Sequence, residues 1–379
     1  MIYKMDKKVK ALVLLSGGLD SMLAAKTLMN QNIEVTGLTF ISYFFGAAKA
    51  RQAAKQLGIE LKEVDFSDEH LEMVKNPKYG YGKNMNPCID CHALMLRKAA
   101  EYLKKDSEET MGLPRRPSPF KKGEEAPRND TKGVYDFIAT GEILGQRPMS
   151  QNKESLAIVA EYSGVGNKLL RPMSAKLLEK TEPEIGEKVT RGKLHTIKGR
   201  TREKQIELVK KYGIKEYFSP SGGCLLTDPG FSEKLIKMLD YWPACTGNDV
   251  ELLKYGRVFW LKTRIATNRN TNSHKFVLIV VGRNKEECEQ LEKLMKKGDI
   301  MMELEEVKGP VTIVRMKNAE CRIKNIAIVE VPEKLKMSEL GMDKEMSEEE
   351  ILETAGLLTG WYATKSRGRQ VNIKLHFIN

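Results

Sequence analysis

Residues Leu12–Leu28 read LVLLSGGLDSMLAAKTL, and this stretch decides the fold. An apolar run turns at two adjacent glycines and continues with apolar residues at helical spacing. Paired glycines permit a tight turn and a close approach of the backbone to a ligand. The helix that follows presents unpaired N–H groups and the positive end of its dipole, so Ser16–Ser21 is predicted to bind an anion.

The strand–loop–helix pattern continues on the C-terminal side. Apolar strands are expected at 34–40, 60–66 and 134–140, with helices at 47–57 and 87–103 between them. Alternating strands and helices predict an α/β fold with a doubly wound parallel sheet. A charged, proline-rich segment at 105–132 is expected to be a mobile insertion, and two charged helices are expected at 177–189 and 201–212. Pro, Gly and polar residues near 241–248 place a boundary between domains 1–245 and 246–379, the second being a smaller α+β domain.

The loop Ser16–Ser21 has neither the Walker A lysine nor a GxGxxG pattern. It resembles the SGGxDS pyrophosphate loop of the N-type ATP pyrophosphatases, whose fold is the adenine nucleotide alpha hydrolase (PP-loop) type. The resemblance implies cleavage of ATP to AMP and pyrophosphate, with Mg²⁺, to adenylate a carbonyl-type oxygen. The implied ATP-binding residues here are Ser16, Gly17, Gly18, Asp20 and Ser21, with adenine near Thr39, Phe40 and Ile41.

A second polar segment follows the 134–140 strand. Residues 137–151 read FIATGEILGQRPMSQ, and Thr140, Gly141 and Gln146 suit the lining of a nucleotide crevice. Composition alone is equally consistent with an ordinary loop. Together with LLRPMSAKLLEKTEPEIGE at 169–187, the segment resembles the tRNA 4-thiouridine synthases. That resemblance implies tRNA thiolation and favours 4-thiouridine over 2-thiouridine.

Cysteines form the third feature. Cys88 and Cys91 make a CxxC near an expected helix N-terminus, a location that lowers thiol pKa, and Cys224 follows a Pro-Ser-Gly-Gly turn. Packing, or a zinc site completed by His92, remains open. A cysteine pair with one distant cysteine resembles two groups of sulfurtransferases. One uses a persulfide relay, and the other holds a [4Fe–4S] cluster on three cysteines. We favour the cluster, with zinc as the alternative occupant. Asp90 is equally consistent with a general base and a helix N-terminal charge.

The net charge of the chain and its distribution indicate the kind of partner that the protein binds. The 379 residues include 63 Lys+Arg and 51 Asp+Glu, a formal net charge of +12. Much of the excess lies in Lys188–Lys211, which is either a solvated face or a phosphate-tracking surface. An apolar run long enough for a membrane span is absent from the sequence, and six scattered cysteines do not form a disulfide scaffold, so we expect a cytoplasmic protein. The candidate RNA contacts in this part are Lys193, Lys198, Arg200 and Arg202.

Residues 248–257 read NDVELLKYGR, residues 280–287 read VVGRNKEE, and residues 363–369 read ATKSRGR. On these segments, residues 249–379 resemble the NFACT-R class of nucleic-acid-associated domains. The motif Ala363–Arg369 supplies Lys365, Arg367 and Arg369 beside Trp361 and Tyr362, a combination suited to phosphate contacts and base stacking. An ordinary basic loop beside core aromatic residues is the alternative.

These resemblances together imply an ATP-dependent tRNA sulfurtransferase. Its catalytic candidates are Cys88, Cys91, Cys224, Asp20 and Asp90, and its partners are tRNA and a sulfide or persulfide donor. Three alternatives are an enzyme that acts on a small molecule with zinc at the cysteines, a non-catalytic RNA-binding protein with a decayed nucleotide site, and an enzyme that removes sulfur.

Overall fold

The structure is a computed structural model that describes residues 8–103, 134–218, 223–264, 276–316 and 328–378. The chain divides into two compact units, Met1–Cys224 and Leu225–Asn379. The expected insertion at 105–132 lies outside the described residues. No helix in the described ranges is long and apolar enough to cross a membrane.

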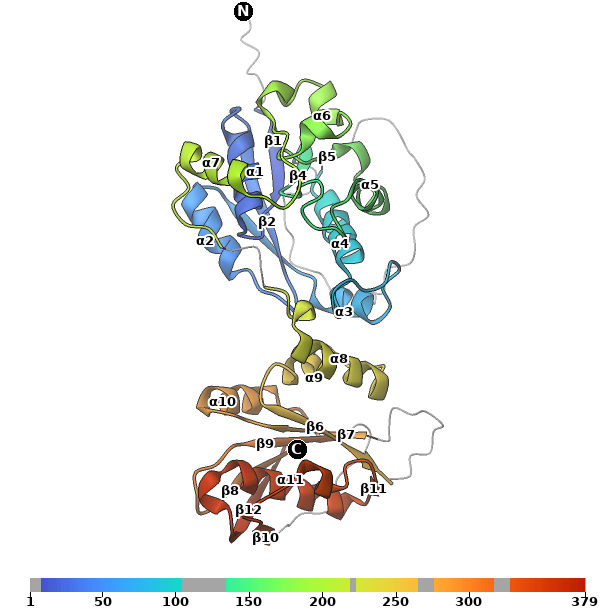
Figure 1. Cartoon of the computed structure of the whole chain (residues 1–379), viewed down its shortest axis with the longest axis vertical. Coiled ribbons are helices and arrows are strands. Elements are labelled where there is room, and N and C mark those ends of the chain that lie inside the picture. Colours follow the sequence, from blue (N-terminus) through green and yellow to red (C-terminus); the bar gives the residue numbers. More distant parts are fainter. Residues whose placement is uncertain (1–7, 104–133, 219–222, 265–275, 317–327, 379) are drawn as a thin grey trace, which may run out of the picture. The chain divides into compact units, whose positions relative to one another are not determined.

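The first unit contains a five-stranded sheet of order β3-β2-β1-β4-β5 in which every pairing is parallel. This arrangement confirms the predicted α/β fold (Figure 1). Its strands are β1 Lys10–Leu14, β2 Glu34–Ile41, β3 Leu61–Asp65, β4 Phe137–Thr140 and β5 Leu169–Leu170. Its helices are α1 Leu19–Met29, α2 Ala48–Leu57, α3 Ser67–Lys75, α4 Cys88–Ala100, α5 Lys153–Tyr162, α6 Glu182–Ile185 and α7 Glu203–Tyr212.

Helices cover both faces of this sheet because the strands are apolar on both sides. Ala11 and Val13 of β1 belong to one core cluster, which includes Leu23 of α1. Leu12 points to the other face and clusters with Leu96 of α4. Alternate residues of a strand point to opposite faces, so this buried β1 supplies both cores.

The strand order also positions the site. From β1 the chain passes to β2 on one side, whereas β4 lies on the other side of β1. In open α/β sheets, ligands bind at the carboxyl ends of the strands where the order reverses in this way. The loops that follow β1 and β4 are therefore the ones placed to form a crevice.

One expected element is largely wrong. The predicted helix at 177–189 is reduced to the single-turn α6, Glu182–Ile185. Thr181 and Glu184 form a capping box that starts the helix, and Gly186 ends it. The high density of Lys and Glu in this segment therefore reflects exposed turns around α6.

The second unit is a mixed seven-stranded sheet of order β10-β12-β8-β9-β7-β6-β11, with α11 packed on one face. Gly356 and Gly360 allow this close packing, since a Cβ at Gly360 would lie 2.4 Å from Val331 Cγ2. The strands are β6 Arg257–Thr263, β7 Phe276–Val281, β8 Ile300–Leu304, β9 Thr312–Met316, β10 Ile328–Val331, β11 Glu345–Met346 and β12 Arg369–Phe377. The helices are α8 Pro229–Tyr241, α9 Gly247–Leu252, α10 Lys285–Leu294 and α11 Glu348–Tyr362.

The division between the units lies earlier than the expected boundary at 245/246, because α8 packs with the second sheet. Trp242 Nε1 donates to the Phe276 carbonyl at 3.2 Å, and the Tyr241 ring stacks on the Phe276 ring with centroids 3.7 Å apart. The Pro- and Gly-containing turn at 241–248 is therefore a turn inside the second unit.

Candidate active site

The loop Ser16–Ser21 joins β1 to α1 at the carboxyl edge of the sheet. Ser16 Oγ accepts a hydrogen bond from Gly18 N at 3.3 Å, and Ser21 Oγ donates to the Gly18 carbonyl at 2.8 Å. The two serine hydroxyls lie 3.4 Å apart. The loop is therefore held by its own side chains, with the N-terminus of α1 directly behind it, as an anion site requires.

Two glycines make this loop possible. Gly17 has φ +78°, and a Cβ there would lie 2.4 Å from the backbone of Lys49. Gly141, at the end of β4, would place a Cβ 2.5 Å from Ser21 N. The segment after β4 thus packs directly against the backbone of the phosphate loop, and this contact brings the two halves of the predicted site together.

Asp20 lies between these halves. Its Oδ2 accepts a hydrogen bond from Gln146 Nε2 at 3.0 Å, whereas Oδ1 is buried without a hydrogen-bond partner among the described residues. Burial raises the pKa of Asp20; the Gln146 hydrogen bond and the positive charges of Arg202 and Arg147 oppose that rise. The carboxylate is therefore surrounded by groups that stabilise its charge.

A buried ion cluster follows β4, and the sequence patterns did not single it out. Glu142 accepts hydrogen bonds from His92 Nδ1 at 2.9 Å, Arg171 Nε at 2.8 Å and Thr140 Oγ1 at 3.0 Å. Burial alone would raise the pKa of Glu142, but the Arg171 charge and then the His92 contacts outweigh it and hold that pKa well below its usual range. Glu142 and Arg171 belong to the TGE and RPMS segments, which was the available signal. The cluster fixes α4, through His92, to the end of β4.

The three predicted cysteines lie in the same region. Cys88 and Cys91 open α4, and the thiols of Cys224 and Cys88 both act electrostatically on Cys91. Burial raises the pKa of Cys91 well above its usual range, and these neighbours raise it further. Burial also raises the pKa of Cys88, against the opposing charge of Arg147 and contacts with Ser150. Cys88 and Cys224 are partly exposed, whereas Cys91 is buried.

The structure does not show a metal site at these thiols within the described residues. In the described ranges, no group of three His, Cys, Asp or Glu side chains is placed to hold a metal ion. The predicted [4Fe–4S] cluster, like the zinc alternative, is therefore not shown by the described residues.

Asp90 has a structural environment. It is 3% exposed, and its two carboxylate oxygens accept the backbone N–H groups of Lys78 at 3.1 Å and Tyr79 at 2.9 Å. These bonds hold the segment before α4 against the helix, so Asp90 fixes the backbone segment that leads to Cys88.

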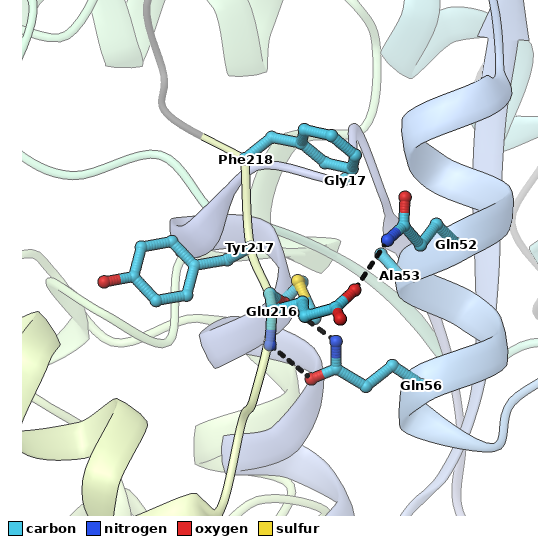
Figure 2. Close-up of a pocket in the computed structure, with 8 residues that line it drawn as sticks. Gly17, Gln52, Ala53, Gln56, Glu216, Tyr217 and Phe218 are labelled. Carbon is cyan, nitrogen blue, oxygen red and sulfur yellow. Dashed lines mark hydrogen bonds between the residues drawn. The ribbon is translucent and has the colours of Figure 1, made fainter.

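A small cavity lies behind the phosphate loop. Its volume is 130 Å³, below the ~300 Å³ of ordinary ligand pockets. Figure 2 shows Gln52 and Gln56 of α2 reaching Glu216, with hydrogen bonds of 2.8 Å from Gln52 Nε2 to Glu216 Oε2 and from Gln56 Nε2 to the Glu216 carbonyl. Phe218 in turn forms a parallel bridge with Gly18. The chain that leads towards Cys224 is therefore fixed to the phosphate loop and to α2.

The residues expected near adenine lie at the carboxyl end of β2. Thr39 and Phe40 are buried, and Phe40 packs on Phe66 with ring centroids 5.0 Å apart; Ile41 is partly exposed. Since the Phe40 ring belongs to the core, an adenine at this edge would meet Ile41 and the strand backbone.

The expected RNA contacts fall into different environments. Lys193, Lys198 and Arg200 are exposed. Arg202 is partly buried, and its positive charge opposes the rise in the pKa of Asp20. In the second unit Lys365, Arg367 and Arg369 are exposed.

The two aromatic residues of that second-unit group already have cationic partners. The Arg367 guanidinium lies 4.1 Å from the Trp361 ring centroid, and the Arg257 guanidinium lies 4.1 Å from that of Tyr362. One face of each ring is thus covered by an arginine.

Comparison with known proteins gives a family-model match in the first unit. Residues 9–111, which contain the phosphate loop and the cysteine pair, match the family model described as the tRNA methyl transferase HUP domain. The tRNA-specific 2-thiouridylase MnmA of Syntrophomonas wolfei is 39% identical over 88 residues, which cover 22% of this chain and 26% of that protein. The MnmA of Syntrophotalea carbinolica is 35% identical over 100 residues, which cover 23% and 28%. The chain thus spans about a quarter of the length of these curated relatives.

Among solved structures, a 4-thiouridine synthetase–RNA complex with bound ATP aligns with a TM-score of 0.31 at 20% identity, covering 65% of this chain and 52% of that chain. A predicted subunit of tRNA methyltransferase from Methanocaldococcus jannaschii aligns with a TM-score of 0.31 at 14% identity, covering 54% and 76%. The sequence match at 9–111 and the parallel sheet agree in identifying the first unit as an α/β fold of the HUP, or PP-loop, type.

Proposed function

We propose that this chain is an ATP-dependent tRNA sulfurtransferase. The observation that carries the proposal is the meeting of a phosphate loop and three cysteines at one edge of one sheet. The positive charge of Arg147 lowers the pKa of both Asp20 in the loop and Cys88, so the nucleotide and sulfur sites share a charged side chain. The names of the curated relatives, tRNA-specific 2-thiouridylases, support the same substrate class.

ATP would bind with its β- and γ-phosphates on Ser16–Ser21, where the N–H groups at the start of α1 stabilise negative charge. The uridine carbonyl oxygen attacks the α-phosphorus, and pyrophosphate leaves. Adenylation is needed because a carbonyl oxygen is a poor leaving group until it carries AMP. Mg²⁺ fits this site through the unpartnered Oδ1 of Asp20, since magnesium is usually held by one or two carboxylates together with substrate phosphates. When bound, it neutralises phosphate charge.

For the sulfur step we propose a persulfide relay at Cys88 and Cys224, which are the partly exposed members of the three predicted cysteines. A persulfide donor protein transfers its terminal sulfur to one of them and leaves as a thiol. That sulfur attacks the adenylated carbon, a C–S bond forms, and the C–O bond to AMP breaks. The second cysteine, after losing its proton, attacks the S–S bond and releases thiouridine. The resulting disulfide is reduced by a thiol reductant before the next cycle.

The observations differ on whether the sulfur enters the uridine at position 4 or position 2. The motifs of residues 137–151 and 169–187 favour 4-thiouridine, whereas the curated relatives are 2-thiouridylases. Mass spectrometry of the product against both nucleoside standards assigns it.

Contacts with tRNA are proposed for the exposed basic residues of both units. Lys193, Lys198 and Arg200 of the first unit, with Lys365, Arg367 and Arg369 of the second, are exposed and can contact phosphates. A domain of the NFACT-R kind in the second unit remains a prediction.

Pyrophosphate release with ATP and unmodified tRNA tests the proposal. Cys88→Ala and Cys224→Ala should still release pyrophosphate but form no thiouridine. Cys288→Ala, in the second unit, should behave like the unaltered protein. The absence of tRNA-stimulated pyrophosphate release with every tRNA tested would instead support a non-catalytic RNA-binding protein. Visible iron–sulfur absorbance of anaerobically purified protein, lost in Cys88→Ala, would restore the predicted cluster and overturn the relay.

A further inference from the structure

Three buried polar atoms without partners meet where α7 approaches the phosphate loop. Gln205 of α7 is fully buried, and neither its Nε2 nor its Oε1 has a hydrogen-bond partner among the described residues. The buried Oδ1 of Asp20 is in the same state. The Gln205 amide is close enough to stabilise the Asp20 carboxylate, although no hydrogen bond of normal geometry joins them. Buried polar groups are nearly always paired, so this concentration indicates a polar ligand.

Backbone contacts hold this part of the chain in place. Gly199 N donates to the Leu144 carbonyl at 2.8 Å, and Lys198 forms a parallel bridge with Leu144. The segment before α7 therefore runs beside the loop that follows β4. That loop supplies Gln146 to one side of Asp20, and α7 supplies Gln205 to another.

Arg202 stands at the start of α7 and is partly buried. It belongs to the basic stretch 188–211, but its environment differs from that of the exposed Lys193, Lys198 and Arg200. Its positive charge acts on Asp20, within the phosphate loop. A guanidinium next to a phosphate loop can bind two phosphate oxygens through two parallel N–H groups, a bidentate geometry that a lysine lacks.

We propose that Arg202 and Gln205 bind the β- and γ-phosphates of ATP at the Ser16–Ser21 loop, and so belong to the nucleotide site. This inference rests on the proposed use of ATP. The Gln205 amide group donates to a phosphate oxygen, and the Arg202 guanidinium neutralises phosphate charge as pyrophosphate leaves. The basic stretch is thereby divided: Arg202 serves the nucleotide, and the exposed lysines and arginine serve tRNA.

Calorimetric titration of the full chain with ATP, inorganic pyrophosphate and AMP tests the assignment. Arg202→Ala should weaken ATP and pyrophosphate binding by about 10- to 100-fold, the range expected for a charged hydrogen bond, and leave AMP binding unchanged. Lys204→Ala is the matched control, because Lys204 is an exposed cation in the same stretch. It should leave all three affinities unchanged.

Gln205→Met separates a ligand contact from a structural role. If Gln205 serves a ligand, the apolar side chain removes two unpaired polar atoms, so the melting temperature is kept or raised while ATP binding weakens. A lowered melting temperature with unchanged ATP affinity would show a structural role and overturn the assignment for Gln205. Unchanged ATP and pyrophosphate affinity in Arg202→Ala would overturn it for Arg202. Failure of the unaltered protein to bind ATP would instead overturn the proposed function.

Discussion

Gly141→Ala probes the contact that joins the two halves of the site. The added methyl carbon would lie 2.5 Å from Ser21 N and 2.6 Å from the Asp20 carbonyl carbon. Heavy atoms in favourable contact lie ~3.5–4.0 Å apart, so the end of β4 and the phosphate loop must separate by about 1 Å. The obstructing atoms are backbone, which cannot turn aside as a flexible side chain would.

This displacement should affect both stability and chemistry. Overpacking of this kind costs ~1–3 kcal/mol, and each kcal/mol lowers the melting temperature of a unit of this size by ~2–4 °C. A reacting group misplaced by about 1 Å can lose roughly 100-fold in rate. We therefore expect a melting temperature several degrees lower and pyrophosphate release slower by about two orders of magnitude.

Scanning calorimetry and a coupled pyrophosphate assay measure the two effects. Gly192→Ala is the matched control, since a Cβ added at Gly192 would meet no heavy atom of the described residues within 4 Å, and its φ is not in the left-handed region. It should be neutral in both assays. Wild-type stability together with wild-type pyrophosphate release in Gly141→Ala would refute the packing of the β4 segment on the phosphate loop.

Three further predictions concern separate parts of the protein. His70 is buried and its pKa is lowered to about 4, so the unfolded chain takes up a proton before the folded protein does as pH falls from 6.5. The free energy of unfolding should therefore drop by about 3 kcal/mol between pH 6.5 and 4. His70→Gln should reduce this pH dependence, which urea titrations at several pH values measure. Oxidation of the intact protein should yield a Cys88–Cys224 disulfide, detected by peptide mass spectrometry; finding neither cysteine in a disulfide would contradict the relay. Lys365→Glu with Arg367→Glu should weaken tRNA binding in filter assays and reduce its salt dependence by about two counterions, whereas an unchanged slope would remove these residues from the interface.

The fold of the first unit could be predicted because the local sequence patterns agree with the overall arrangement of its strands and helices. At residues 12–28 an apolar strand, a glycine turn and a helical pattern of apolar residues follow one another, and the structure has β1, the loop and α1 in the same order. The cysteine pair was likewise expected at the start of a helix, and α4 begins at Cys88. Such features depend on neighbours in the sequence.

Features formed by residues far apart in the sequence could not be predicted from it. The Glu142–Arg171–His92 cluster joins three segments, and single side chains carry no signal of their partners. Arg202 looked like any other cation of its stretch, and only folding places it beside Asp20.

The second unit shows a different reason for failure. Strand β12, Arg369–Phe377, was not anticipated, although its buried Val371 and Ile373 alternate with polar residues, which is the pattern of a half-buried strand. It pairs with β10 and β8, which lie far away in the sequence. The alternation was therefore an available signal for the strand, whereas its pairing with distant strands left no signal in the local sequence.

The most direct test of the sulfurtransferase proposal is mass spectrometry of nucleosides from unmodified tRNA incubated with the protein, ATP, Mg²⁺, a persulfide donor and a thiol reductant. We predict a thiolated uridine that appears only with ATP and is lost in Cys88→Ala and Cys224→Ala. An unchanged nucleoside profile, with ATP bound and every component present, would contradict the proposed function.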